Sequence, residues 1–182
     1  LAEAMFSAGI DCFRGNLDDV LSRFAECASE YPTENIIRLT ADCPLADPEV
    51  IDSVVLHHLN SGADYTSNTL KRTFPRGLDV ECFTSEAFSR LQKFELSSQE
   101  REHVTMGFYQ RPEIFVLENV SDAIDRSELR WTVDYPEDLT VVREIYRKLY
   151  SDINLFTSED IREVISQHPE LNRLESDVEG HN

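Results

Sequence analysis

Apolar side chains recur along the chain at two spacings, one typical of amphipathic helices and one typical of buried strands. The helical spacing predicts helices over 1–8, 18–30, 47–60, 84–94, 99–110, 136–150 and 157–168. Apolar runs of strand length predict strands over 10–13, 35–40, 64–68, 78–83, 114–120 and 129–133. Pro48 suits the first turn of one helix, and Gly62 suits its end. Strands and helices therefore alternate along the chain.

This alternation predicts the fold class. Strands that alternate with helices imply right-handed crossovers and a mostly parallel sheet with helices on both faces. We expect one α/β domain over residues 1–182, with a polar, disordered tail at 172–182. Sheets of this kind bind ligands beyond the carboxyl ends of their strands, so the candidate chemistry is sought there.

Composition excludes some classes of partner. The 182 residues carry 17 Lys and Arg against 35 Asp and Glu, a formal net charge of −18. Nucleic acids and anionic membranes are bound through Lys and Arg, so we expect neither as a partner. We find no apolar stretch long enough to span a bilayer and no leader pattern, which predicts a cytoplasmic protein. The four cysteines lack zinc-site spacing, and we expect reduced, mostly buried thiols.

Two aspartates follow predicted strands. Asp42 comes soon after the strand at 35–40, and Asp134 directly follows the strand at 129–133. If those strands are close, the two carboxylates converge and could hold Mg²⁺, which takes few protein ligands beside phosphate oxygens. Such an ion would neutralise charge on a phosphoryl group during transfer. Alternatively, Asp134 caps the next helix with Glu137 as its reciprocal partner, and Asp42 hydrogen-bonds its own turn.

A cluster of cations stands out in this acidic chain. Lys71, Arg72 and Arg76 fall within six positions, in the loop KRTFPRG. Guanidinium groups suit carboxylates and phosphates, so the loop is a candidate site for a substrate anion, met by Arg72 or Arg76. The alternative is a solvated loop whose cations pair with neighbouring acids.

Three further features are candidate substrate contacts. Asp79 and Glu81 lie on one face of a predicted strand, where they could accept hydrogen bonds from sugar hydroxyls or form the exposed face of an edge strand. His103 lies among charged residues and is either a structural histidine or a substrate contact. Arg130 leads into Asp134 and could border the same pocket.

Five segments of the chain resemble one protein family, in order and at plausible spacing. They resemble the cytidylyltransferase family of spore coat polysaccharide biosynthesis proteins, which is related to the enzymes that make CMP-activated sialic acid and CMP-activated Kdo. The resemblance implies a Rossmann-like, three-layer α/β/α sandwich and transfer of CMP from CTP to an acidic or related sugar, with release of pyrophosphate. The segments are 13–24, 36–52, 62–83, 99–105 and 129–139.

The resemblance also assigns candidate roles. Asp42 and Asp134 match the family's Mg²⁺ carboxylates and would be the catalytic pair, and Arg14 and Gly15 match part of the nucleotide pocket. A homodimer is implied, with 62–110 as the contact region. The candidate substrate-binding residues are Arg72, Arg76, Gly77, Asp79, Glu81, His103 and Arg130.

One part of the family pattern has no counterpart here. The family opens with a strand and a glycine- and arginine-containing loop that wraps the triphosphate, and we expect this chain to be the carboxyl-terminal portion of such a domain, lacking its first strand. Without that loop the triphosphate would lose most of its donors and cations. The alternative to an enzyme is a degenerate, non-catalytic domain that binds a sugar or a partner. A glycosyltransferase ranks last, since the chain holds no D-x-D triplet.

Overall fold

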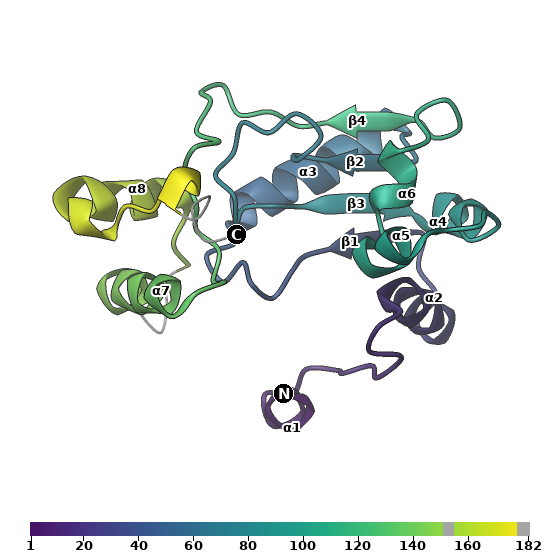
Figure 1. The fold of residues 1–182 in the computed structure, drawn as a ribbon, viewed down its shortest axis with the longest axis horizontal. Helices are drawn as coiled ribbons and strands as arrows, with labels where there is room; N and C mark the ends of the chain where they lie inside the picture. The colour runs from purple at the N-terminus through teal and green to yellow at the C-terminus, as the bar shows by residue number, and fades with distance from the viewer. Residues whose placement is uncertain (151–154, 178–182) are drawn as a thin grey trace.

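A four-stranded sheet lies at the centre of the computed structural model, which describes residues 1–150 and 155–177 (Figure 1). Its strand order is β1 (Asn35–Arg38), β3 (Glu81–Thr84), β2 (Tyr65–Ser67) and β4 (Leu117–Asn119). β3 is antiparallel to both of its neighbours, and β2 is parallel to β4. β1, β2 and β4 therefore share one direction, which confirms the mostly parallel sheet, and β3 runs against them.

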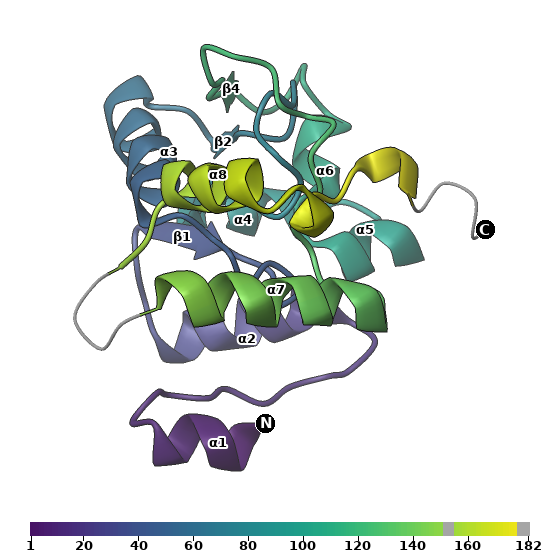
Figure 2. The same cartoon turned by 90° about the vertical axis from the view of Figure 1, so that its left-hand side faces the viewer.

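Helices cover both faces of this sheet. α3 lies on one face, and α5 and α6 lie on the other (Figures 1 and 2). The parallel strands point toward α7 and α8 (Figure 1). The helices are α1 (Ala2–Ser7), α2 (Val20–Glu30), α3 (Pro48–Ser61), α4 (Ser85–Leu91), α5 (Ser98–His103), α6 (Met106–Tyr109), α7 (Pro136–Leu149) and α8 (Ser158–Gln167), with 3₁₀ turns at Pro169–Leu171 and Glu175–Asp177.

Each face of the sheet has its own apolar core. Successive strand residues point to opposite faces, so Cys82 of β3 packs in one cluster and Phe83 in the other. The first cluster joins α3 to α7 and α8 through residues such as Val54 and Ile145. The second joins α2, α4 and α6 through residues such as Phe108. The expected three-layer α/β/α arrangement follows from these two cores.

Helix α3 shows how local sequence sets an element's ends. The Asp47 carboxylate accepts a hydrogen bond from the Glu49 backbone N–H at 2.8 Å, Pro48 occupies the first turn, and Gly62 ends the helix at φ 69°. The predicted helix over 47–60 is confirmed because these residues satisfy the end groups that a helix leaves unpaired. Asp47 also accepts from the backbone N–H of Ser158 at 2.6 Å, which ties α3 to α8.

Two predicted strands are wrong. Residues 10–13 are irregular, and Ile10 is 55% exposed. No strand in the described ranges lies beside them to form backbone hydrogen bonds with them. Residues 129–133 form isolated bridges, Leu129 with Leu174 and Arg130 with Arg76, and do not enter the sheet.

The predicted helix over 99–110 is broken into α5 and α6. The break falls at Val104, whose φ is 55° and whose side chain is fully buried. A positive φ is unfavourable for a β-branched residue, so tertiary packing rather than local preference imposes this bend.

The structure describes only part of the predicted tail at 172–182. Residues 178–182 lie outside the described residues, whereas Arg173 forms an ion pair with Asp138, and Glu175 forms one with Arg76.

All four cysteines are free thiols. Cys43 and Cys82 are buried, which raises the pKa of each to about 11, but Cys12 is exposed. No helix in the described part of the chain combines the length and apolar character that crossing a bilayer requires.

Candidate functional site

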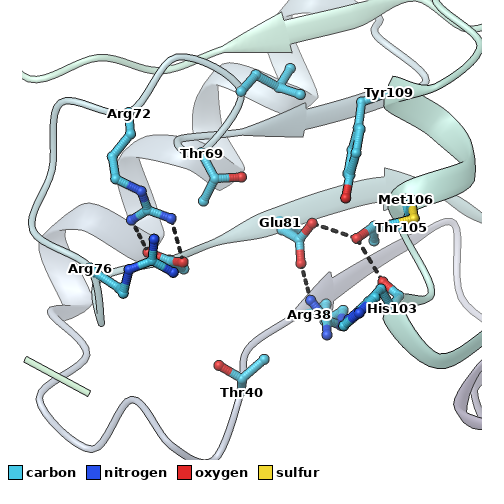
Figure 3. A pocket seen from close by; sticks show the side chains of 12 residues that line it. Arg38, Thr40, Thr69, Arg72, Arg76, Glu81, His103, Thr105, Met106 and Tyr109 are labelled. Carbon is cyan, nitrogen blue, oxygen red and sulfur yellow. Dashed lines mark hydrogen bonds and ion pairs between the residues drawn. The ribbon is translucent and has the colours of Figure 1, made fainter. Parts of the chain in front are cut away.

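A pocket of about 540 Å³ lies where the sheet meets α5 and α6 (Figure 3). Its walls come from β1 and the residues after it, the loop between β2 and β3, β3 itself, and the α5–α6 junction. The lining residues are Arg38, Thr40, Thr69, Leu70, Arg72, Arg76, Asp79, Glu81, His103, Thr105, Met106 and Tyr109.

The pocket gathers most of the residues predicted to bind substrate. They come from two separate parts of the sequence, the segment from 72 to 81 and His103, and the fold alone brings these together. Glu81 lies on β3, which is an inner strand, so the alternative of an exposed edge strand does not apply to it. The five that line the pocket are Arg72, Arg76, Asp79, Glu81 and His103.

Two cations of the 71–77 loop, Arg72 and Arg76, line this pocket and are paired with acids. Arg72 donates to both carboxylate oxygens of Asp79, at 2.5 and 2.7 Å, and these hydrogen bonds raise the pKa of Arg72 above its ordinary value. Arg76 Nε lies 2.9 Å from Glu175 Oε2. The alternative in which cations of the loop pair with neighbouring acids is therefore confirmed for both arginines, and their predicted contact with a substrate anion stays a prediction.

Glu81 is the most enclosed charge of the site, with 8% of its surface exposed. Its Oε1 accepts from the hydroxyls of Tyr65 and Thr105, both at 2.6 Å, and its Oε2 accepts from Arg38 Nη1. Burial, and then the charge of Glu81, raises the pKa of Tyr65, which keeps that hydroxyl a donor. Both oxygens of Glu81 thus already accept from the protein's own donors, and its predicted contact with sugar hydroxyls stays a prediction.

The α5–α6 junction turns two side chains into the pocket. The backbone N–H of Thr105 donates to the carbonyl oxygen of His103 at 2.5 Å, closing a three-residue turn around Val104. Such a turn with positive φ is rare and strained. His103 is exposed, and its ring makes no hydrogen bond within the described residues, which disfavours the structural alternative.

The segments that carry the two candidate metal ligands meet. The carbonyl oxygen of Asp42 accepts a hydrogen bond from the backbone N–H of Val133 at 2.8 Å, so the chain beyond β1 lies against the residue before Asp134. Asp42 is exposed, and Asp134 is half-exposed, with its Oδ2 accepting from Arg130 and, at 2.9 Å, from the Thr132 hydroxyl. In the described ranges no three Asp, Glu, His or Cys residues form a metal cluster.

Arg130 is not a pocket residue. It is 3% exposed and donates to Asp138 Oδ1 at 2.9 Å. Burial would raise the pKa of Asp138, but its hydrogen bonds with Arg130 and with the backbone N–H groups of Asp134 and Tyr135 outweigh burial and hold the pKa at about 2. Tyr135 is the capping residue directly before α7, and Asp138, rather than Glu137, accepts from the backbone there. The predicted substrate contact of Arg130 is corrected to a structural ion pair.

Three further candidates lie outside the pocket lining. Arg14 and Gly15 are exposed between α1 and α2. Gly77 has φ 107°, and a Cβ there would lie 2.7 Å from the carbonyl carbon of Trp131. The role of Gly77 is to let the loop pack against Trp131, whose backbone N–H donates to the Arg76 carbonyl oxygen at 2.7 Å.

Arg38 is the most informative residue that sequence reasoning missed. A cation within the apolar run NIIRLT was the available signal, because a strand rarely buries an arginine without a partner. The other missed lining residues, which carry no comparable signal, are Thr40, Thr69, Leu70, Thr105, Met106 and Tyr109.

Comparison with known proteins gives consistent results. A family model described as cytidylyltransferase matches residues 1–141. An uncharacterized protein of Methanocaldococcus jannaschii is 31% identical over 183 residues, covering 98% of this chain and 72% of the relative. The spore coat polysaccharide biosynthesis protein SpsF of Bacillus subtilis is 29% identical over 143 residues, covering 77% of this chain and 58% of SpsF.

A solved structure confirms the fold. The cytidylyltransferase from Leptospira borgpetersenii serovar Hardjo-bovis superposes with a TM-score of 0.86 at 32% identity, covering 93% of this chain and 71% of that one. The expected Rossmann-like class is thereby confirmed. The family model spans more than half of the chain, and both sequence and fold agree with it, so this chain belongs to the cytidylyltransferase family.

Proposed function

We propose that this protein transfers the cytidylyl group of CTP to a sugar, giving a CMP-sugar and pyrophosphate, in the synthesis of a surface polysaccharide. Family membership and the name of the SpsF relative support the reaction class and its setting. The observation that carries the proposal is the pocket, because it brings polar side chains that can form hydrogen bonds from distant parts of the chain to one place.

The pocket suits the acceptor sugar. Asp79 and the hydroxyls of Thr40 and Thr69 offer acceptors and donors to a polyhydroxylated ligand. In the reaction, an oxygen of the sugar bonds to the α-phosphorus of CTP, and the bond from that phosphorus to pyrophosphate breaks. The contribution of the pocket is to hold the attacking oxygen in place, since positioning supplies much of the rate in phosphoryl transfer.

Asp42 and Asp134 fit a Mg²⁺ site. Both are accessible carboxylates on adjoining segments, and Mg²⁺ takes a few protein oxygens while phosphates and waters complete its shell. When bound, this ion would neutralise charge on the phosphates of CTP. Arg130 and Thr132 hold Asp134 Oδ2, so they orient this carboxylate and leave Oδ1 for a ligand.

The remaining parts of the proposal rest on the sequence. A homodimer in contact through 62–110, a cytoplasmic location, and Arg14 and Gly15 as nucleotide contacts stay predictions. Nucleic acid stays an expected non-partner because of the acidic composition.

Pyrophosphate release tests the reaction. With CTP, Mg²⁺ and a panel of neutral and acidic sugars, the full-length natural protein should release pyrophosphate, and chelation of the metal should abolish it. Asp42→Asn and Asp134→Asn should each lower kcat by about 100-fold or more, because each removes a charge from the metal site. Asp52→Asn, an exposed position on α3, is the matched control and should leave kcat unchanged.

Two outcomes would contradict the proposal. Release in Asp42→Asn equal to that of the parent would remove the metal role of this residue. A folded protein that shows no calorimetric binding of Mg·CTP and no release would favour the alternative, a non-catalytic domain that binds a sugar or a partner.

A further inference from the structure

The segment that follows the first 3₁₀ turn returns to the body of the protein beside the pocket. Its backbone is held there at two points. The carbonyl oxygen of Arg173 accepts a hydrogen bond from the backbone N–H of Arg130 at 2.9 Å. The backbone N–H of Glu175 donates to the carbonyl oxygen of Glu128, also at 2.9 Å. These contacts fix the backbone at Glu175, so its side chain alone is left to move.

Glu175 brings a negative charge to the arginine side of the pocket. Figure 3 shows Arg72 and Arg76 together on that side. Glu175 lies outside the pocket lining, and its Oε2 is 2.9 Å from Arg76 Nε. The pKa of Arg72 is raised chiefly by its hydrogen bonds with Asp79, and the charge of Glu175 acts in the same direction. Glu175 therefore acts electrostatically on both arginines.

The contact between Glu175 and Arg76 is weakly held. Glu175 Oε2 is closed off from solvent, yet it accepts no hydrogen bond from the described part of the chain. A buried acceptor without a hydrogen bond costs free energy, which is recovered when the acceptor returns to water. The side chains of Arg76 and Glu175 are 45% and 32% exposed, and ion pairs as exposed as this contribute little to stability. The carboxylate is therefore easily displaced from Arg76.

Arg76 keeps donors for a ligand while Glu175 faces its Nε. Among residues 1–150 and 155–177, no partner engages the two Nη atoms of Arg76. A guanidinium group binds one anion in parallel through Nε–H and Nη2–H. An anion can therefore approach the free Nη atoms, and the paired edge becomes available to it once the Glu175 carboxylate moves away. The ligand and Glu175 thus compete for the same cation.

We propose that Glu175 is a built-in competitor for Arg76, and that its carboxylate holds this arginine until an anionic oxygen of a ligand displaces it. The inference rests on the proposed function, which supplies two sources of such an oxygen, the phosphates of CTP and the carboxylate of an acidic sugar. Glu175 lies beyond residue 141, where the match to the family model ends. Glu175 thereby sets how strongly the pocket binds an anion.

Binding of small anions tests this competition without catalysis. Inorganic phosphate and D-glucuronate represent the two sources of the anion, and D-glucose is the neutral probe. In ¹H–¹⁵N titrations of the full-length natural protein, Glu175→Gln should tighten the binding of at least one anion by about threefold, because a partly exposed ion pair no longer has to be broken. The affinity for D-glucose should not change. The anion whose binding tightens identifies the source.

A matched variant controls for net charge. Glu163→Gln removes the same charge at an exposed position of α8 and should bind both anions as the parent does. A loss of stability cannot imitate the expected result, because a partly unfolded protein binds its ligands more weakly.

A double variant separates competition from repulsion at a distance. Arg76→Gln alone should weaken anion binding, and Glu175→Gln added to it should have almost no further effect, because Glu175 then has no cation to hold. The Arg76 Nε–H signal, identified by its absence from Arg76→Gln, should shift in Glu175→Gln. The same signal should shift in the parent when the anion binds.

Two results would overturn the inference. One is anion binding in Glu175→Gln that equals the parent's for both anions. The other is an equal tightening by Glu175→Gln with and without Arg76, which would show a general effect of charge on the pocket. Failure of the proposed function is distinguishable, because a protein that shows the competition and releases no pyrophosphate with CTP contradicts the reaction alone.

Discussion

Two buried carboxylates illustrate how single residues organise this protein. Glu81 and Asp138 each face an arginine and at least two further donors, Glu81 at the pocket and Asp138 at the start of α7. A buried charge is tolerated only when such partners replace its water. Each carboxylate therefore fixes the arginine that it faces.

Removing the charge of Asp138 is expected to destabilise the fold. Asp138→Asn would leave the buried guanidinium of Arg130 without its buried partner, at a cost of about 3 kcal/mol in the free energy of unfolding. Urea unfolding measures this cost, with the exposed Glu137→Gln as control. The pKa of Asp138, about 2 against an ordinary 3.8, places its contribution above pH 3.8 and its loss as the pH falls toward 2. A cost below about 1 kcal/mol would show that the pair is not effectively buried.

At the scale of elements, a buried histidine joins a helix to the sheet. His58 of α3 contacts the Thr66 hydroxyl of β2 through Nδ1 at 2.9 Å and Asn35 of β1 through Nε2 at 3.1 Å. Burial lowers the pKa of His58, with the charge of His57 in the same sense and that of Asp64 opposed. The neutral ring is thus the form that links these elements.

This linkage predicts a pH dependence. Because the folded pKa of His58 lies below its ordinary 6.5, the unfolded chain binds the proton more tightly, and stability should fall as the pH drops below about 6.5. Between pH 7 and pH 5, above the range of the carboxylates, His58→Gln should flatten the slope of unfolding free energy against pH. His57→Gln, at a more exposed ring, is the comparison. Equal slopes in the parent and His58→Gln would contradict the assignment.

At the scale of the whole molecule, the charge balance is strongly acidic. A formal net charge of −18 remains after every cation is counted, although many arginines are paired with acids. Excess charge of one sign destabilises a folded chain through self-repulsion. The pocket is a local exception, where arginines gather against this background.

Salt should therefore stabilise the protein. Raising NaCl from about 0.02 to about 0.3 M shortens the screening length and should raise Tm by about 3 °C. The same rise with KCl, measured by calorimetry, would identify screening rather than a specific ion. A fall in Tm would mean that attraction within the ion pairs outweighs repulsion across the molecule.

Local signals in the sequence were enough to predict the type of most elements and the ends of several. Helix α3 is the clearest case, since Asp47, Pro48 and Gly62 act on backbone groups within a few residues of themselves. The pairing of strands could not be read in the same way. Alternating apolar residues do not reveal that β3 runs antiparallel to both of its neighbours. The run at 129–133 has strand character but makes only isolated bridges.

The candidate site, too, could be predicted only in part from the sequence. Residue chemistry and family resemblance were enough to name Arg72, Asp79 and His103, which share the pocket, because charge and hydrogen-bonding capacity belong to the side chain itself. The sequence could not show which of the charged groups are already engaged in hydrogen bonds with other residues of the protein. Arg72 pairs with Asp79, which is close to it in the chain, whereas Arg38 pairs with Glu81 on another strand, and such a contact exists only once packing has brought the two segments together.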